Sequence, residues 1–117
     1  MKNQELNRMI PIYFPNLESK YLEEINWQEG DDTGSHIIYG DVLTPYIVQC
    51  IENENKNEIK KIFNFIEELL NLNDEYAEEV VTLSIFESIL YLFENHKEVI
   101  NMVGKKSTKI LDELYKF

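Results

Sequence analysis

Few residues of this chain have the types and spacing that catalysis or metal binding requires. His36 lies in a glycine-punctuated stretch and His96 follows a hydrophobic run, and neither has a nucleophile at a local spacing. The closest approach to a Glu-x-x-His metal motif is Glu94-Asn95-His96, whose spacing is too short. The sequence has no His-Glu-x-x-His motif, calcium loop or glycine-rich phosphate loop. We therefore predict no catalytic residue, no metal ligand and no cofactor, and a protein that is not an enzyme.

Two serines, Ser84 and Ser88, lie in the most hydrophobic run of the chain. A serine nucleophile needs a base, and a group that orients the base, within hydrogen-bond reach. Sequence spacing supplies neither. The simpler interpretation is that both are small residues that let a neighbouring element pack closely.

Two carboxylates lie close to apolar stripes of expected helices. A helical projection places Glu87 among Tyr76, Val80, Leu83 and Leu90, and Glu67 borders the stripe of the preceding helix. A buried carboxylate must be paired, hydrogen-bonded or protonated. Glu67 and Glu87 then either form a polar site between two helices or accept structural hydrogen bonds, and the structural interpretation is favoured.

Aromatic and acidic residues gather in one polar stretch with the composition of a recognition surface. It contains Trp27, Glu29, Asp31, Asp32 and Tyr39. A partner can bury an aromatic anchor while the neighbouring acids contact Lys or Arg. The alternative is that Trp27 folds back onto the core and the acids are solvated.

The formal net charge of −11 limits the choice of partner. The stretch 62–96 contains no Lys or Arg, and the stretch 17–55 contains only Lys20. Acidic residues in the first stretch are Glu67, Glu68, Asp74, Glu75, Glu78, Glu79, Glu87 and Glu94. Such a surface repels phosphate, so direct nucleic-acid or anionic-membrane binding is disfavoured and a basic protein partner is favoured. The alternative is that the excess acid only keeps the protein soluble.

Length and composition predict one domain over residues 1–117, because 44% hydrophobic residues are enough to form one core. The start of the chain is polar and then broken by Pro11, so we expect no secretory signal and a cytoplasmic protein. The single cysteine, Cys50, suits a reducing compartment.

Helical spacing dominates the chain on both sides of one polar, glycine-punctuated stretch. We expect a helix from about Asn3 that ends at Pro11, and a second helix capped by Asn16. The stretch 26–36 is expected to be an exposed loop and 37–39 an extended lead-in. A helix then runs from Asp41 or Thr44 to about residue 52.

The second half of the chain has clearer helix signals. Asn55 and Asp74 are expected to cap two helices, the first with its apolar stripe over residues 59–70. The second, about 75–94, is apolar on every side and is expected to be enclosed by the others. Gly104 closes a short helix and Ser107 caps a last one. The predicted fold is all-α, a bundle of five to seven helices around the helix over 75–94.

Four short motifs carry a family resemblance. They are Tyr39-Gly40-Asp41, Phe65-Ile66-Glu67-Glu68-Leu69, Phe86-Glu87-Ser88-Ile89-Leu90 and Met102-Val103-Gly104-Lys105-Lys106-Ser107. Over 39–115 the chain resembles small helical bacterial immunity proteins of polymorphic and contact-dependent growth inhibition toxin systems. The resemblance implies an antitoxin that binds the C-terminal RNase or DNase domain of a larger effector, whose basic surface an acidic inhibitor can cover.

The expected mechanism is stoichiometric inhibition by acidic side chains with an aromatic anchor. The residues expected to bind the partner are Trp27, Glu29, Asp31, Asp32, Tyr39, Asp74, Glu75, Glu78 and Glu79. The alternative is a helical enzyme or small-ligand-binding domain with a pocket near Glu67 and Glu87.

Overall fold

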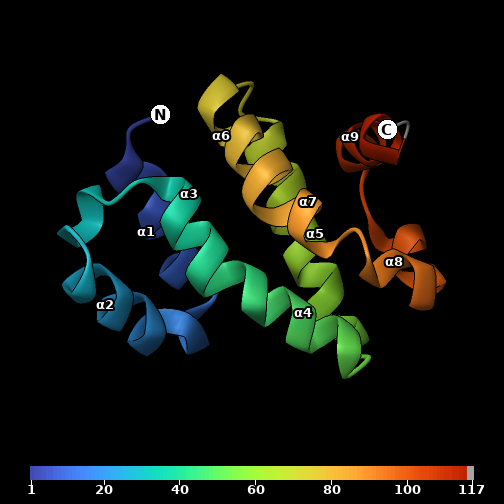
Figure 1. Ribbon diagram of the computed structural model, residues 1–117, viewed down its shortest axis with the longest axis horizontal. Coiled ribbons are helices and arrows are strands. Elements are labelled where there is room, and N and C mark those ends of the chain that lie inside the picture. The colour runs from blue at the N-terminus through green and yellow to red at the C-terminus, as the bar shows by residue number, and fades with distance from the viewer. Residues whose placement is uncertain (116–117) are drawn as a thin grey trace.

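The computed structural model describes residues 1–115, and within them all regular structure is helical (Figure 1). The helices are α1 (Asn3–Tyr13), α2 (Glu18–Trp27), α3 (Ser35–Ile38), α4 (Thr44–Glu52), α5 (Lys56–Leu70), α6 (Glu75–Val80), α7 (Glu87–Ile89), α8 (Leu92–Asn95) and α9 (Lys105–Tyr115). Two π-helical segments, Tyr39–Leu43 and Val81–Phe86, join α3 to α4 and α6 to α7. Short 3₁₀ segments lie at Pro15–Leu17, Gly30–Asp32 and Lys97–Met102. The predicted all-α fold is confirmed.

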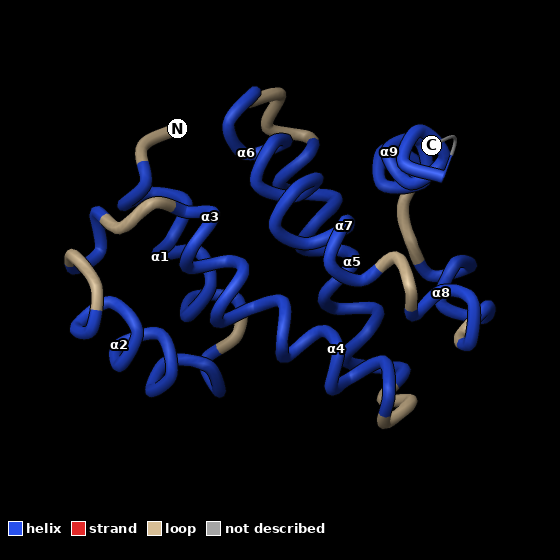
Figure 2. The backbone as a smooth tube through the Cα atoms, viewed as in Figure 1, coloured by secondary structure: helices blue, strands red, loops and turns tan. Residues whose placement is uncertain are grey.

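The helices enclose one hydrophobic cluster. α5 contacts α4, α6, α9 and the 3₁₀ segment Lys97–Met102, and α6 and α7 lie in front of it in Figure 1. The tube in Figure 2 shows α1, α2 and α3 grouped at one side of these helices and α8 and α9 at the other. Buried side chains from all these groups belong to the same cluster. No helix of residues 1–115 has the length and hydropathy needed to cross a lipid bilayer.

The expected end of the first helix at Pro11 is wrong, because α1 continues to Tyr13. Proline lacks the N–H that would bond the carbonyl four residues earlier, which costs helix stability. Leu6, Ile10 and Phe14 are fully buried around this point, and the Phe14 N–H donates to the Ile10 carbonyl at 2.8 Å. Burial of these side chains offsets the missing hydrogen bond.

The expected loop over 26–36 is correct for 28–34 but wrong at both ends, which are helical, and the expected extended segment over 37–39 is wrong. Residues 35–52 are helical throughout, and Ile38, Tyr39, Val42, Leu43 and Ile47 are buried along them. These buried positions follow helical spacing. The β-branched pair Ile37-Ile38 suggests a strand in the sequence, but strand propensity depends strongly on context and did not decide the structure here. The preceding loop is short and tightly held, since Thr33 and Ser35 are buried.

The expected caps at Asn55 and Asp74 are confirmed: Asn55 accepts a hydrogen bond from the Glu58 N–H and Asp74 from the Ala77 N–H. Asn16 is not a cap, because the 3₁₀ turn Pro15–Leu17 leads directly into α2 without a side-chain hydrogen bond.

The helix predicted over about 75–94 is continuous only to Ile89, includes the π segment Val81–Phe86, and is not enclosed on all sides. Val80, Val81, Ile85 and Phe86 are buried, but Leu83 is 45% exposed and Tyr91 60% exposed. One side of the helical stretch 75–89 therefore faces solvent, and that side carries apolar as well as acidic side chains.

Candidate protein-binding surface

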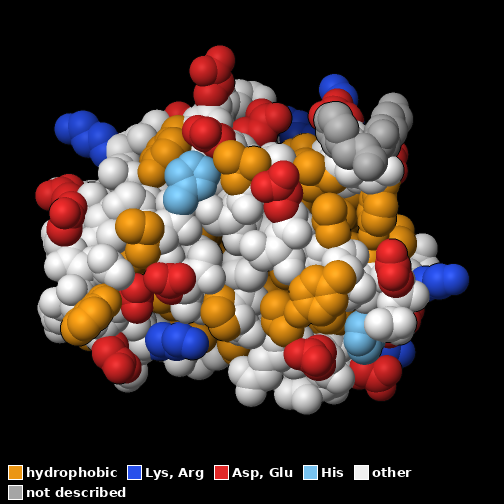
Figure 3. Space-filling model, in the orientation of Figure 1, with side chains coloured by type: hydrophobic (Ala, Val, Ile, Leu, Met, Phe, Trp, Pro, Cys, Tyr) orange, Lys and Arg blue, Asp and Glu red, His pale blue; other side chains and the backbone are white. Residues whose placement is uncertain are grey.

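Three glutamates of α6 form one exposed acidic surface. Glu75, Glu78 and Glu79 line a shallow hollow of about 490 Å³ together with Thr82 and the half-exposed Leu83. We call these five residues the α6 acidic face. In Figure 3, acidic side chains gather over α6 beside hydrophobic ones. Carboxylates around an apolar side chain suit a lysine or arginine, whose head pairs with the acids while its methylene stem covers the apolar surface.

Trp27 is the most exposed large hydrophobic side chain of residues 1–115, at 79%. The alternative that it folds back onto the core is therefore wrong. It is the last residue of α2, and Glu29 and the exposed Asp32 follow it within five residues. An exposed tryptophan beside acids has the composition of an interaction anchor.

Asp31 is already paired within the chain. Its carboxylate accepts hydrogen bonds from the Arg8 guanidinium, and this contact raises the pKa of Arg8. Asp31 is therefore less available to a partner than Asp32.

Tyr39 does not lie on the surface, so its predicted contact with a partner is wrong. Its ring is fully buried and its hydroxyl donates to the Leu6 carbonyl at 2.6 Å. Burial disfavours the phenolate and raises the pKa of Tyr39. Its role is to fasten the start of the long helical stretch 35–52 against α1.

Asp74 also has internal partners. It accepts a hydrogen bond from the Met1 ammonium at 2.6 Å and from the Ala77 N–H at 2.9 Å. The ammonium and then the backbone N–H favour the ionised carboxylate and lower the pKa of Asp74. Asp74 thus fixes the start of α6. The exposed negative charge of this helix is carried by the glutamates that follow, Glu75, Glu78 and Glu79.

Asn3 joins the two acidic segments that the sequence predicts separately. Its side-chain oxygen accepts from the Tyr76 hydroxyl at 2.6 Å and the Ser35 N–H at 3.1 Å, and its amide donates to the Asp32 carbonyl at 3.4 Å. The fully buried Asn7, one turn further along α1, donates to the Thr33 carbonyl at 2.7 Å. These contacts place Gly30–Asp32 and α6 on either side of the start of α1.

Sequence reasoning missed both asparagines. The available signal for Asn7 was its position next to the apolar stripe of Leu6 and Ile10. An amide buried there needs hydrogen-bond partners, so the position could have indicated a structural contact. Asn3 gives no comparable signal, since its partners lie 29 to 73 residues away in the chain.

Glu67 and Glu87 do not form a site together. Glu87 is exposed, contrary to the expectation of partial burial. Glu67 caps α9 by accepting from the Lys106 N–H at 2.9 Å, the Ser107 N–H at 3.3 Å and the Ser107 hydroxyl at 3.1 Å. The expected cap by Ser107 is therefore wrong, because the helix starts at Lys105 and an acid from α5 satisfies its first N–H groups.

Gly104 permits this contact and does not close the preceding helix. A Cβ at Gly104 would lie 2.3 Å from Oε2 of Glu67 and 2.4 Å from its Cδ. Only glycine lets the backbone come so close to the carboxylate.

His36 and Ser84 are brought together across 48 residues. Nδ1 of His36 lies 2.8 Å from the Ser84 hydroxyl oxygen, and Nε2 lies 3.9 Å from Oε2 of Glu79. This resembles the three parts of a nucleophilic site, but the imidazole–carboxylate distance exceeds a hydrogen bond. Ser84 also lies inside a π-helical segment, where neighbouring N–H groups bond within the helix and do not point at a substrate. The contact is better explained as a tie between α3 and the segment Val81–Phe86.

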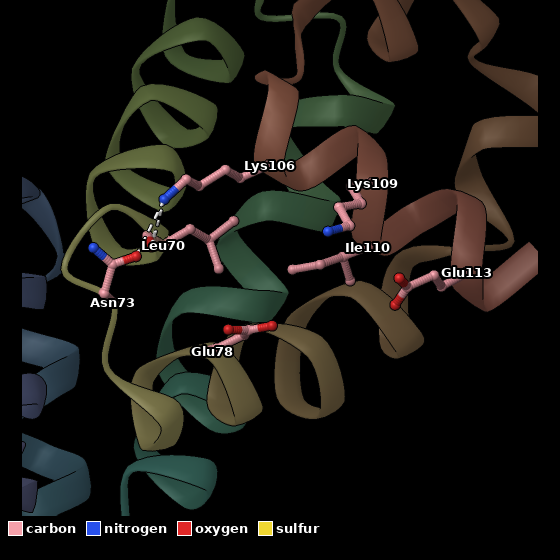
Figure 4. Close-up of a pocket in the computed structure, with 7 residues that line it drawn as sticks. All are labelled: Leu70, Asn73, Glu78, Lys106, Lys109, Ile110 and Glu113. Atoms are coloured by element: carbon pink, nitrogen blue, oxygen red, sulfur yellow. Dashed lines mark hydrogen bonds between the residues drawn. The ribbon is translucent and has the colours of Figure 1, made fainter.

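A second hollow, of about 250 Å³, lies between α9 and the ends of α5 and α6 (Figure 4). It is lined by Leu70, Asn73, Glu78, Lys106, Lys109, Ile110 and Glu113. Lys106 reaches across it to the Leu70 carbonyl at 3.5 Å and the Asn73 side-chain oxygen at 3.4 Å. Two lysines and two glutamates leave this hollow with a mixed charge, unlike the α6 acidic face.

The fold and this surface define a small all-α protein with an acidic, partly apolar face. Residues 7–117 match the model of a domain of unknown function, DUF7674, and the chain belongs to that family. Among curated proteins and among solved structures, none matches the chain.

Proposed function

We propose that this protein is an antitoxin of the immunity-protein class, which binds a basic toxin nuclease domain in the cytoplasm and covers its active site. The observation that carries the proposal is the α6 acidic face, in which three exposed glutamates surround a half-exposed leucine. The protein acts here as a stoichiometric inhibitor and not as an enzyme.

The charge distribution supports a basic protein as the partner. The stretch 62–96 contains no Lys or Arg, so no basic residue of that stretch offsets Glu75, Glu78 and Glu79 on α6. An RNase or DNase domain carries positive charge where it holds phosphates. Complementary fields accelerate encounter, while the same acids repel nucleic acid from the inhibitor itself.

Trp27 supplies the second element of the proposed interface. Electrostatic attraction chiefly sets the rate of encounter, whereas a buried aromatic anchor slows dissociation. We retain six of the predicted contact residues in the proposal, because Tyr39 is buried and Asp31 and Asp74 have internal partners. The six are Trp27, Glu29, Asp32, Glu75, Glu78 and Glu79.

The geometry offers no support for the alternative of a ligand-binding or catalytic pocket near Glu67 and Glu87. Glu67 is occupied with the start of α9, and Glu87 is exposed. Neither Glu67 nor Glu87 lines the hollow beside α6 or the hollow between α9 and the ends of α5 and α6.

Co-expression tests the proposal directly. The C-terminal domain of the protein encoded by the adjacent upstream gene is induced in a bacterial host with and without this chain. We expect the domain alone to stop growth, and this chain to restore growth and to co-purify with the domain at one to one. A toxic domain that neither binds the chain nor is neutralised by it would overturn the proposal, as would a neighbouring product without toxicity.

A further inference from the structure

A histidine and two glutamates converge at the side of the molecule formed by the end of α4 and the start of the segment Lys97–Met102. One donor atom each from Glu54, His96 and Glu98 lies within 4.8 Å of the other two. Nδ1 of His96 and Oε1 of Glu98 are 3.9 Å apart. Glu54 is 42 residues away in sequence from His96, so the fold and not a local motif brings these donors together.

The backbone holds each donor in a defined place. Glu54 lies in the turn after α4, where its N–H donates to the Ile51 carbonyl at 3.1 Å and the Asn55 N–H to the Cys50 carbonyl at 3.0 Å. The His96 N–H donates to the Leu92 carbonyl and its own carbonyl accepts from the Val99 N–H, both at 3.0 Å. The two anchor segments are thus ordered by hydrogen bonds that do not involve the donor side chains.

The imidazole of His96 is the residue that distinguishes this cluster from ordinary surface acid. Its side chain is only 20% exposed, yet within residues 1–115 the ring accepts or donates no hydrogen bond. A ring nitrogen of a partly shielded side chain, 3.9 Å from one carboxylate and close to a second, has the surroundings of a metal ligand.

We propose that Glu54, His96 and Glu98 form a binding site for a divalent transition metal ion such as Zn²⁺. Imidazole nitrogen and carboxylate oxygen are both zinc ligands, and three protein ligands leave a fourth position for water. A tetrahedral zinc site separates its ligand atoms by about 3.4 Å, given bonds of about 2.0–2.2 Å. The exposed glutamates reach that separation by small side-chain rotations, since half of the Glu98 side chain is free in solvent.

The donor set also selects among cations. Ca²⁺ and Mg²⁺ take all-oxygen sites with six or more ligands, which this cluster does not offer, whereas a nitrogen donor favours zinc and its neighbours in the transition series. The bound ion would neutralise two nearby carboxylates and connect the turn after α4 to the segment Lys97–Met102. This site shares no residue with the α6 acidic face, so the two proposals succeed or fail independently.

Isothermal titration of the full chain with zinc chloride tests the site. We expect one zinc ion per chain and at least about a tenfold loss of affinity in His96→Ala. His36→Ala is the matched control, because it removes the other histidine, which also lies 3.9 Å from a glutamate, and should leave the affinity unchanged. Magnesium chloride in excess should not displace the zinc.

A second variant separates ligand loss from damage to the fold. Glu54 has a φ of 55°, a left-handed backbone conformation that glycine adopts without strain. Glu54→Gly should therefore keep or raise the melting temperature of the metal-free protein while weakening zinc binding. Absence of zinc binding by the unmodified chain would overturn the proposal. Equal affinity in His96→Ala would do so too, because zinc would then be held by acids elsewhere.

Discussion

The carboxylate of Glu67 fixes the relative position of two helices, because it lies on α5 and accepts three hydrogen bonds from the start of α9. Free N–H groups at a helix start are a cost of helix formation, and an acid that satisfies them stabilises the helix by about 1 kcal/mol. The contact needs glycine at position 104, so the two residues form one unit.

Gly104→Ala should lower the free energy of unfolding by about 1–2 kcal/mol, because the new methyl group displaces the Glu67 cap. Gly40→Ala is the control: a Cβ there meets nothing within 4 Å, and alanine favours helix over glycine. Urea denaturation measures both variants. In a Glu67→Ala background the cost of Gly104→Ala should shrink, since the cap is already lost. Full additivity of the two changes would contradict the capping role.

Helix positions could be predicted from sequence wherever the periodicity was long and capped. The apolar spacing over 59–70 and the caps at Asn55 and Asp74 locate α5 and α6 correctly. The errors have tertiary causes. Core burial carries α1 past Pro11, and packing keeps 37–39 helical in spite of its β-branched residues.

Candidate contacts were predicted less well than helices, because availability depends on distant partners. Trp27 and the α6 glutamates are exposed as a partner-binding role requires. Tyr39 is buried, and Asp31 and Asp74 are paired with Arg8 and Met1, which no local pattern indicates.

The two π-helical segments are the least regular elements of the fold, and they contact each other. A π turn departs from the regular hydrogen-bond pattern of an α-helix. Here the Thr44 hydroxyl donates to the Ser84 carbonyl at 2.7 Å, and Thr44 is only 6% exposed.

Thr44→Val should destabilise the fold by about 1–2 kcal/mol, because a shielded carbonyl loses its hydroxyl donor while the side-chain shape is kept. Thr108→Val is the matched control. That hydroxyl also donates to a carbonyl, of Gly104 at 2.9 Å, but in an exposed position where water can replace it. Its cost should stay within about 0.5 kcal/mol. Equal costs in thermal or urea unfolding would show that the hydrogen bond between Thr44 and the Val81–Phe86 segment contributes nothing specific.

Viewed as a whole, the molecule has a helical stretch, 75–89, that carries acidic side chains and no lysine, and a helix, α9, that carries Lys105, Lys106 and Lys109. The hollow of Figure 4 marks the border between these regions, because Glu78 lines it together with Lys106 and Lys109. A net charge of −11 alone would explain solubility. The exposed Leu83 and Trp27 beside the acids are not explained by solubility and fit a surface that a partner covers.

The role proposed for the α6 acidic face is tested by the affinity of two triple charge-reversal variants for the toxic domain of the co-expression experiment. One carries Glu75→Lys, Glu78→Lys and Glu79→Lys on the α6 acidic face, and the other carries Glu52→Lys, Glu94→Lys and Asp112→Lys at exposed positions elsewhere. Each reversal changes the charge by two units, so both variants have a formal net charge of −5 in place of −11.

Calorimetry at moderate salt, after circular dichroism has confirmed folding, compares the two variants with the unmodified chain. We predict a loss of affinity of about 100-fold or more for the α6 variant, because close charge pairs at such interfaces couple by several kcal/mol. The other variant should lose about tenfold or less, the effect of reduced long-range attraction alone. Equal losses in both variants would show that total charge and not the α6 acidic face determines binding, and would contradict the proposed role of Glu75, Glu78 and Glu79.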